Sequence, residues 1–475
     1  MRAGSEERGR AHELVGFQAR GEFHRRRVEV IGSVPNAGRA ETVRAIAAAE
    51  KAFESFSRTT ADERAKLLRR LHAAIMDNQR ALAELLTIEQ GKPLAESMGE
   101  VGGSAAYVLW FAEEARRVYG DVIPSPWGER RILAIKQPVG VVAAITPWNF
   151  PSSMLARKIG PALATGCTSV VKPATQTPYS GLAWGVLAEQ AGYPAGVVNI
   201  LTGSASEIGG EMTSNPTVRK ITFTGSTPIG KILMKQAADT VKRVSMELGG
   251  NAPFVIFDDA DLDKAVEGAI ASKYRNSGQT CVCANRFYAQ AGIYDAFVEK
   301  FAAASAKLKV GSGLEDGVVQ GPLIDDKAVA KTESFVADAL AKGGKVVTGG
   351  KRHALGGQFF EPTVIANASS EMSFAREEIF GPVAPVFRFE TEEEAVRLAN
   401  DTEFGLACYF YTRDLARAFR VSEALRYGQV GINAGVITTE VAPFGGVKES
   451  GVGREGSMYG VDEYVDIKYV CIGGL

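Results

Sequence analysis

The spacing of apolar residues predicts an opening helical region followed by alternating strands and helices. In the early part of the chain, apolar residues recur every three to four positions, as on one face of a helix. This spacing predicts helices over 42–56, 60–78, 80–90 and 95–119. Thr42 is the expected N-cap of the first helix, and the third is expected to end at Gly91, just before Pro93. Residues 1–30 carry no periodic pattern, and we expect a poorly ordered arm there with a short strand over 27–31.

Further along, the pattern predicts two units in which strands and helices alternate. After a strand over 130–137 and a buried apolar strand over 141–145, the first unit has strands over 169–171, 197–201, 218–223 and 244–248, and helices over 154–164, 180–191, 206–213 and 231–238. The second unit has elements over 254–257, 262–273, 294–308, 328–343, 345–348, 384–389, 392–400 and 415–426. Such alternation predicts parallel sheets covered by helices, which is an α/β fold.

Two predicted strands have no partner nearby in sequence. They cover 130–137 and 463–472. A strand of this kind often pairs across a subunit contact or onto another domain. A chain of 475 residues suggests about three domains.

Composition and charge exclude several classes of function. With 45% hydrophobic residues, 23% charged residues and a net charge of −1, the chain is typical of a globular protein that binds neither nucleic acid nor an anionic membrane. No apolar run approaches the ~20 residues that span a bilayer, and the first 30 residues lack the apolar core of a signal peptide. Five cysteines, an odd number, indicate a reducing compartment, and we expect a cytoplasmic protein. The four histidines are scattered, so we expect no metal site and a Glu or Asp as any general base.

The stretch 276–283 (NSGQTCVC) is the first candidate for chemistry. It lies between a predicted helix and an apolar run, and Gly278 allows a tight turn before Cys281. A thiolate presented on such a loop is a strong nucleophile, provided that its surroundings lower the thiol pKa. Taken alone, Cys281 is better explained as a small buried apolar residue, and the rest of the chain changes that weighing.

Other polar residues follow predicted strands, where α/β sheets bind ligands. Thr146, Pro147, Trp148 and Asn149 form a Pro-bounded loop after strand 141–145. Lys172 ends the next strand, and Gly225 and Ser226 form a turn from strand to helix, the kind of helix N-terminus that binds phosphate. The spacing is not G-x-G-x-x-G, so taken alone an ordinary turn between strand and helix is the better explanation. Glu247 ends a strand before Gly249 and Gly250, as a candidate base or as a solvated carboxylate.

Seven short motifs together resemble the aldehyde dehydrogenase superfamily from about residue 40 to the end. They are PWNFP at 147–151, KPA at 172–174, FTGS at 223–226, ELGG at 247–250, GQTC at 278–281, EIFGP at 378–382 and PFGG at 443–446. Within the superfamily the chain is most similar to the succinate-semialdehyde dehydrogenases, through residues 111–121, 278–283 and 469–475. The N-terminal arm departs from the family pattern.

The resemblance implies three domains. A Rossmann-type cofactor-binding domain would comprise residues 1–120 and 142–247, and an α/β catalytic domain residues 248–445. A small β oligomerisation element would comprise 121–141 and 446–475 and would make the protein a homodimer or a homotetramer.

The resemblance also implies an oxidation of a small-molecule aldehyde. Cys281 would attack the aldehyde carbon, Asn149 and the Cys281 backbone N–H would stabilise the oxyanion, and Glu247 would activate water against the thioester. The implied cofactor-binding residues are Thr146, Pro147, Trp148, Lys172, Thr175, Gly225, Ser226, Glu378 and Phe380. Packing is an equally good reading of Phe380.

Thr175 decides the expected cofactor. In NAD-preferring relatives a Glu usually lies three residues after the lysine, and here that position is Thr175. A carboxylate would repel a 2′-phosphate, whereas Thr175 would not and Lys172 would attract it. We therefore expect NADP as the preferred cofactor, with NAD possible.

The implied substrate is succinate semialdehyde, which carries a carboxylate at its far end. A guanidinium is well suited to bind that group, and the resemblance places Arg157 and Arg275, with Thr438, in the substrate pocket. Without the resemblance, each Arg would be read as a surface charge. Cys283 is a candidate redox partner of Cys281 through a reversible disulfide, or else a packed side chain.

Several alternative functions remain open from the sequence. The substrate could be glutarate semialdehyde or another aliphatic aldehyde. A CoA-acylating relative is disfavoured because Glu247 is present as a hydrolytic base. A catalytically silent binding protein is disfavoured because packing does not require Cys281, Glu247, Asn149 and Lys172 together.

Overall fold

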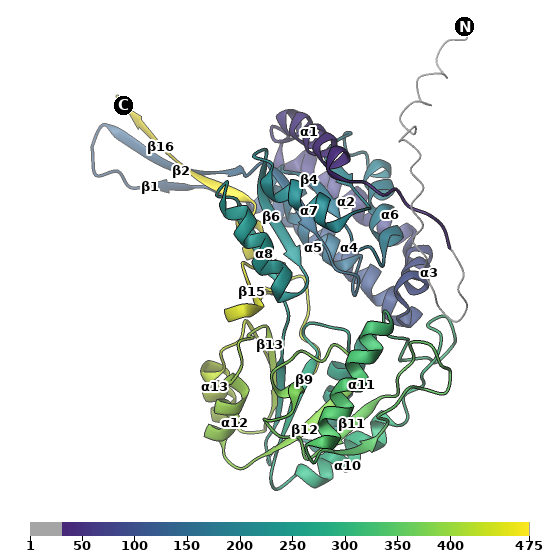
Figure 1. The fold of residues 1–475 in the computed structure, drawn as a ribbon. Helices are drawn as coiled ribbons and strands as arrows, with labels where there is room; N and C mark the ends of the chain where they lie inside the picture. The colour runs from purple at the N-terminus through teal and green to yellow at the C-terminus, as the bar shows by residue number, and fades with distance from the viewer. Residues whose placement is uncertain (1–30, 475) are drawn as a thin grey trace.

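Three β-sheets organise the computed structural model, which describes residues 31–474 (Figure 1). The arm and the strand expected before residue 31 lie outside the described residues. The remaining chain forms an upper body, a lower body and a projecting β arm (Figure 1). None of the helices within 31–474 combines the length and the apolar character that crossing a bilayer requires.

The four expected early helices are confirmed, with shifted ends. They are α1 (Arg39–Phe56), α2 (Ala61–Asp77), α3 (Gln79–Gln90) and α4 (Leu94–Glu114). Thr42 is not the N-cap of α1: Gly38 is, and the Thr42 hydroxyl donates to the Gly38 carbonyl (2.8 Å) from inside the first turn. Gly91 ends α3 in the left-handed conformation, as expected. α4 stops earlier than predicted and gives way to a short 3₁₀ helix, η1 (Ala115–Arg117).

A six-stranded sheet forms the upper body, in the order β15-β7-β6-β3-β4-β5. Its parallel strands are β3 (Val141–Ile145), β4 (Thr168–Lys172), β5 (Val198–Ile200), β6 (Val218–Thr224) and β7 (Arg243–Glu247), with β15 (Gly451–Val452) antiparallel at the edge. The connecting helices are α5 (Ser153–Thr165), α6 (Pro178–Gln190), α7 (Ala205–Ser214) and α8 (Thr227–Ala238). α8 begins four residues before its predicted start, because the fixed φ of Pro228 suits a first turn.

A seven-stranded sheet forms the lower body, in the order β10-β11-β12-β9-β8-β13-β14. Its strands are β8 (Ala252–Ile256), β9 (Ala284–Gln290), β10 (Lys345–Thr348), β11 (Thr363–Ala366), β12 (Val383–Phe389), β13 (Ala407–Tyr411) and β14 (Gln429–Ile432). Its helices are α9 (Leu262–Tyr274), α10 (Tyr294–Ser305), α11 (Asp326–Ala341), α12 (Glu392–Asn400) and α13 (Leu415–Ala424). Two short 3₁₀ helices are η3 (Ser373–Ala375), before β12, and η4 (Lys448–Ser450), directly before β15. The sequence pattern missed β11, β13 and β14.

The chain passes between the two bodies at residues 248–251. β7 of the upper sheet ends at Glu247, and β8 of the lower sheet begins at Ala252. The crossing is tight, because a Cβ at Gly250 would lie 2.4 Å from the carbonyl oxygen of Cys281. The ELGG motif therefore brings Glu247 and the Cys281 loop to the junction of the bodies.

The projecting arm is a three-stranded antiparallel sheet. It consists of β1 (Asp121–Ile123), β2 (Arg130–Pro138) and β16 (Val465–Gly473), and the small helix α14 (Tyr459–Asp462) precedes β16. The two strands that lacked partners in the sequence pair with each other, in a register that runs from Pro138 opposite Val465 to Arg130 opposite Gly473. Within this chain, each of these two strands therefore has the other as its partner, rather than a strand of another domain.

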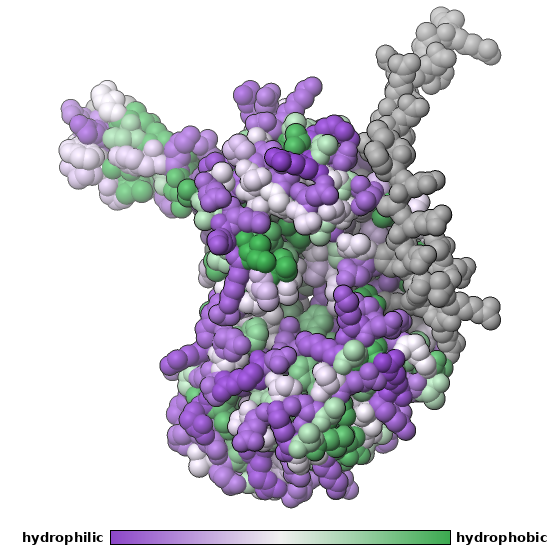
Figure 2. All heavy atoms as spheres, in the orientation of Figure 1, coloured by the Kyte–Doolittle hydropathy of each residue, from purple (hydrophilic) through white to green (hydrophobic). Residues whose placement is uncertain are grey.

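The arm exposes an unusual amount of apolar surface. Val122 is 78% exposed, Ile467 71% and Tyr469 60%. Figure 2 shows hydrophobic residues gathered along this projection. The proposed domain boundaries stay a prediction, and β15 adds one detail: part of the expected oligomerisation segment returns to the upper sheet.

Candidate active site

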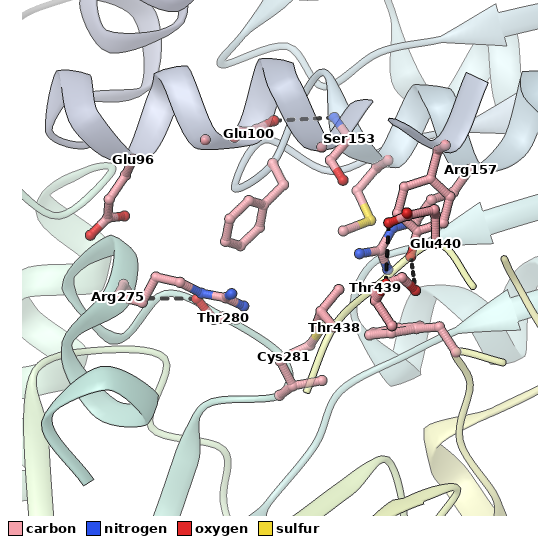
Figure 3. Close-up of a pocket in the computed structure, with 17 residues that line it drawn as sticks. Glu96, Glu100, Ser153, Arg157, Arg275, Thr280, Cys281, Thr438, Thr439 and Glu440 are labelled. Atoms are coloured by element: carbon pink, nitrogen blue, oxygen red, sulfur yellow. Dashed lines mark hydrogen bonds between the residues drawn. The ribbon is translucent and has the colours of Figure 1, made fainter. Parts of the chain in front are cut away.

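A cavity of about 340 Å³ lies between the helices of the upper body and the Cys281 loop. Four segments line it: α4, the stretch from Phe150 into the first turns of α5, the segment from Arg275 to Val282 before β9, and the segment before residue 445 (Figure 3). The lining residues are Glu96, Gly99, Glu100, Gly103, Tyr107, Phe150, Ser153, Met154, Arg157, Arg275, Thr280, Cys281, Val282, Thr438, Thr439, Glu440 and Phe444. The cavity brings together Cys281, Arg157, Arg275 and Thr438, which the sequence placed at the site.

A strained turn sets Cys281 on the cavity wall. Asn276 (φ 51°) and Ser277 (φ 57°) adopt the left-handed conformation inside the short helix η2 (Arg275–Gly278). Gly278 follows at φ 77°, where a Cβ would lie 2.2 Å from the Gly381 carbonyl oxygen. Left-handed non-glycine residues cost about 1–3 kcal/mol each and persist only where their surroundings hold them. The Ser277 hydroxyl is held by the Gly321 carbonyl (2.8 Å).

The surroundings of Cys281 raise its pKa. Burial raises the pKa of the thiol to about 12, and the carboxylate of Glu378 adds to the effect. The guanidinium groups of Arg157 and Arg275 oppose it only in part. The Cys281 thiol thus does not have the lowered pKa that favours a thiolate, because burial outweighs the nearby positive charges. A nucleophilic Cys281 needs a group that removes its proton.

Asn149 braces the Cys281 loop without lining the cavity. Its side-chain amide donates to the carbonyl of Gln279 (3.1 Å), two residues before the thiol. Its own carbonyl accepts from the Nζ of Lys92 (2.7 Å) and from the side chain of Asn276 (3.0 Å). The loop after β3 and the loop before β9, far apart in sequence, are thus joined at Asn149.

Glu247 is buried next to this cavity rather than in its lining. It is 3% exposed, and its Oε2 has no hydrogen-bond partner within residues 31–474. Burial raises the pKa of the Glu247 carboxyl well above its usual value, and the charge of Glu455 raises it further. Lys158, which pairs with Glu455 (2.5 Å), and Arg157 oppose that shift. Glu247 also raises the pKa of Cys281, so the two side chains share one electrostatic environment.

Arg157 is buried, and part of its guanidinium has no hydrogen-bond partner among the described residues. It is 4% exposed and lies between two rings, 4.9 Å from Tyr107 and 4.3 Å from Phe444. Its Nε and Nη1 have no hydrogen-bond partner in the part of the chain that the structure describes. A buried donor without a partner is costly, so this guanidinium is suited to an anionic group that enters the cavity.

Arg275 and Thr438 face the same cavity from other segments. Arg275 follows α9 and lies with its guanidinium 5.3 Å from the ring of Phe150. Figure 3 shows Arg275 and Arg157 approaching the cavity from opposite sides, with Thr438 close to Cys281. An aldehyde at the thiol could therefore place a distant carboxylate near either cation.

The sequence pattern missed several polar residues that line the cavity, among them Tyr107, Glu96 and Glu440. Tyr107 and Glu96 lie on α4, a helix in which the sequence analysis named no site residue, and Glu440 lies two residues after Thr438. The Tyr107 hydroxyl donates to the Thr439 carbonyl (3.1 Å), and Glu96 accepts from the Asn276 backbone N–H (2.8 Å). A tyrosine and a glutamate toward the buried side of an apolar helix were the signals that could have revealed them.

The expected cofactor residues gather at the carboxyl ends of β3, β4 and β6. Lys172 ends β4, and its Nζ donates to the Pro173 carbonyl (3.0 Å) and to the Thr175 hydroxyl (3.1 Å). The buried hydroxyls of Thr146 and Thr224, at the ends of β3 and β6, have no partner within 31–474. Orphaned polar groups at this edge of a parallel sheet fit a polar ligand.

The turn after β6 supplies a site for phosphate. Ser226, next to Gly225, is the N-cap of α8, and no side chain caps that helix end. Its first backbone N–H groups and the helix dipole favour a negatively charged group. These residues therefore fit the pyrophosphate of a dinucleotide.

Glu378 and Phe380 lie at the border between this edge and Cys281. Glu378 Oε1 accepts from the Gly250 backbone N–H (2.9 Å), and burial raises the pKa of Glu378 to about 7. Phe380, at φ 54°, packs edge-on against Trp148, with ring centroids 5.7 Å apart. Trp148 follows Pro147 in the loop that also carries Asn149.

Cys283 is turned away from Cys281. It is buried, and its Sγ donates to the carbonyl of Lys273 (3.1 Å) on α9. Both thiols are free. A disulfide between them would require Cys283 to leave this position, and the redox hypothesis stays a prediction.

An α/β fold with a cysteine, two cations and a dinucleotide-type sheet edge around one junction is typical of an oxidoreductase that acts on aldehydes. The chain belongs to the aldehyde dehydrogenase family, whose sequence model matches residues 22–470. It is 63% identical to the glutarate-semialdehyde dehydrogenase of Pseudomonas aeruginosa over 447 residues, which cover 94% of this chain and 92% of that protein. It is 60% identical to the NADP⁺ succinate-semialdehyde dehydrogenase of Escherichia coli, with 93% and 92% covered.

A solved structure has the same fold. The succinate-semialdehyde dehydrogenase of Burkholderia pseudomallei superposes with a TM-score of 0.95 at 60% sequence identity. The match covers 96% of this chain and 95% of that one. The predicted aldehyde-dehydrogenase-like α/β fold is confirmed.

Proposed function

We propose that this enzyme oxidises succinate semialdehyde to succinate with NADP⁺. The observation that carries the proposal is the buried guanidinium of Arg157, whose Nε and Nη1 lack partners within the described chain, in the cavity that also holds Cys281. An aldehyde with a carboxylate at its far end satisfies both features at once, because the thiol takes the carbonyl carbon and the guanidinium takes the anion. The relatives named for this substrate support the assignment.

In the proposed reaction, Cys281 loses its proton and adds to the aldehyde carbon to form a thiohemiacetal. The Asn149 amide and the Cys281 backbone N–H stabilise the oxyanion, and one such donor is worth about 3 kcal/mol. When bound, the oxidised nicotinamide supplies the hydride acceptor. Oxidation of the adduct leaves a thioester on Cys281, and water activated by Glu247 releases the carboxylic acid and the thiol.

The cofactor is held by the edge of the upper sheet in this proposal. Lys172 and Thr175 meet the adenosine ribose, and Gly225 and Ser226 meet the pyrophosphate at the start of α8. Glu378 meets the nicotinamide ribose, while Phe380, Trp148, Pro147 and Thr146 pack beside it. Lys172 has no carboxylate partner among the described residues, which supports attraction of a 2′-phosphate and so a preference for NADP.

Thr175→Glu is expected to reverse the cofactor preference. The new carboxylate would lie next to Lys172 and repel the 2′-phosphate, since like charges brought together cost several kcal/mol. We expect the ratio of kcat/KM for NADP to kcat/KM for NAD to fall by about 10- to 100-fold. Thr175→Gln, which has the same shape without the charge, is the control and should change the ratio much less. A wild-type enzyme that strongly prefers NAD would contradict the proposal.

Arg275→Ala is expected to weaken binding of the carboxylated substrate selectively. We expect KM for succinate semialdehyde to rise about tenfold or more, equivalent to about 1.4 kcal/mol, because one cation facing the carboxylate is lost. KM for butanal, an uncharged aldehyde of similar length, should change little. Arg388→Ala, at an exposed ion pair with Asp295, is a control distant from the cavity. Equal effects on both aldehydes would refute the carboxylate role.

Glutarate semialdehyde is a second candidate substrate. The relative at 63% identity that bears this name supports it. An additional methylene changes binding by only about 1–3 kcal/mol in a typical pocket, so one arginine pair can serve both chain lengths. Parallel kcat/KM measurements with the two semialdehydes rank them.

We also infer that the exposed apolar arm joins copies of this chain into a homodimer or a homotetramer, and that the free cysteines suit the cytoplasm. A monomer in sedimentation at micromolar concentration would contradict the first inference.

A further inference from the structure

Lys92 is a fully buried cation that contacts the Asn149 loop directly. It lies between α3 and α4, and its side chain has no exposed surface. Its Nζ donates to the carbonyl of Asn149 (2.7 Å) and to Oε2 of Glu100 (2.5 Å). The ammonium also lies 3.7 Å from the ring centroid of Phe150. Every one of these contacts is on the loop after β3 or on α4, which lines the cavity.

Glu100 extends the same contact to the start of α5. Its Oε1 accepts the backbone N–H groups of Ser152 (2.9 Å) and Ser153 (3.2 Å), the latter drawn as a dashed line in Figure 3. These are N–H groups that a helix leaves without partners at its first turn. α5 carries Arg157 one turn further along. One ion pair thus holds both the Asn149 loop and the helix of the substrate cation.

Neighbouring residues of Lys92 hold the other side of the site. Gln90 donates to Oδ1 of Asn276 (2.7 Å), and Glu96 accepts the Asn276 backbone N–H (2.8 Å). Asn276 is the first left-handed residue of the strained turn before Cys281, and its side chain donates to the same Asn149 carbonyl that Lys92 contacts (3.0 Å). The Asn149 carbonyl therefore accepts two hydrogen bonds, one from Lys92 and one from Asn276 of the cysteine loop.

We propose that Lys92 is a positioning residue that sets the Asn149 side chain for oxyanion stabilisation by holding the Asn149 carbonyl. The proposal rests on the role proposed above for Asn149. The charged Lys92 Nζ, 2.7 Å from the Asn149 carbonyl, fixes the backbone of Asn149 and so limits where its side chain can lie. The side-chain amide of Asn149 then donates to the carbonyl of Gln279, two residues before the thiol. Small displacements of such groups are costly: a shift of about 1 Å can lower a rate about 100-fold.

A double-mutant cycle tests this proposal. Lys92→Met is expected to lower kcat by about 10- to 100-fold with both succinate semialdehyde and butanal, because the oxyanion is common to both. KM for butanal, which does not use the cation on α5, should stay within about threefold. Because Lys92 acts through Asn149, the Lys92→Met/Asn149→Ala enzyme should have a kcat within about threefold of Asn149→Ala alone. Losses that multiply, or an unchanged kcat in Lys92→Met, would overturn the positioning role.

Control variants separate positioning from general stability. Lys242 is another buried lysine that bridges two backbone carbonyls, those of Asn215 (2.6 Å) and Val218 (2.8 Å), away from the cavity. Lys242→Met should lower Tm while kcat stays within about twofold. If Lys92→Met is too unstable to purify, Lys92→Met/Glu100→Gln replaces it in the cycle, because it leaves no buried charge unpaired. Full activity in Asn149→Ala would instead refute the role of Asn149 itself.

Discussion

Cys281→Ala is expected to abolish aldehyde oxidation, with kcat lower by about 10⁴-fold or more. The thiol is the only sulfur among the cavity-lining residues apart from the thioether of Met154, and no other lining side chain is a comparable nucleophile. Without it, neither the thiohemiacetal nor the thioester forms. NADPH formation, followed by absorbance after the enzyme is mixed with succinate semialdehyde, measures the effect.

Cys408→Ala is the matched control for this experiment. Cys408 lies on β13 in the core of the lower body, fully buried and remote from the cavity. The same chemical change should lower stability slightly and leave kcat nearly unaltered. A Cys281→Ala enzyme that retains a tenth of the wild-type kcat would show that the reaction does not proceed through this thiol.

Glu247→Gln is expected to block the second half of the reaction rather than the first. Loss of a general base typically costs about 10²- to 10⁴-fold, so steady-state kcat should fall by that factor. The thioester still forms on Cys281, so rapid mixing should give a burst of about one NADPH per active site before turnover slows. Glu211→Gln is the control and should behave as wild type. Glu211 lies on α7 and forms an ion pair with Arg39 of α1.

The pH dependence follows from the raised pKa of Glu247. Burial keeps this carboxyl protonated at pH values where an exposed Glu is already ionised, and a protonated carboxyl is no base. Thioester hydrolysis should therefore increase as pH rises through the raised pKa and decrease as pH falls. Glu247→Gln should lose this dependence in the steady state. Because the Cys281 pKa is also raised, to about 12, the burst rate should still increase with pH in the variant.

The position of Glu247 makes this experiment decisive. The carboxylate is buried near Glu455 and Lys158 and is not among the residues that line the cavity. A Glu247→Gln enzyme with wild-type kcat and no burst would assign hydrolysis to another group. Glu440, a carboxylate in the cavity lining close in sequence to Thr438, would then be the first to replace.

Features that depend on a few neighbouring residues could be predicted from the sequence. The helices α1 to α4, the strands β3 to β8 and the turn at Ser226 follow from local periodicity, capping and the conformational freedom of glycine. The Cys281 loop belongs with them, because Gly278 lies three residues before the thiol and its φ of 77° favours glycine. The family resemblance placed Cys281, Arg157, Arg275 and Thr438 in one site, and they line one cavity.

Other features depend on contacts between residues hundreds of positions apart, and local patterns carry no information about them. β2 and β16 pair across more than 300 residues, so each alone looked like a strand without a partner. The free guanidinium of Arg157 exists only because Tyr107 and Phe444 enclose it. The sequence by itself determined the class of fold, the family and the chemistry of the cysteine. Only the tertiary structure decided the raised pKa of the Cys281 thiol, the burial of Glu247 and the hydrogen bond from Lys92 to the Asn149 carbonyl. All three depend on burial and on packing between separate segments.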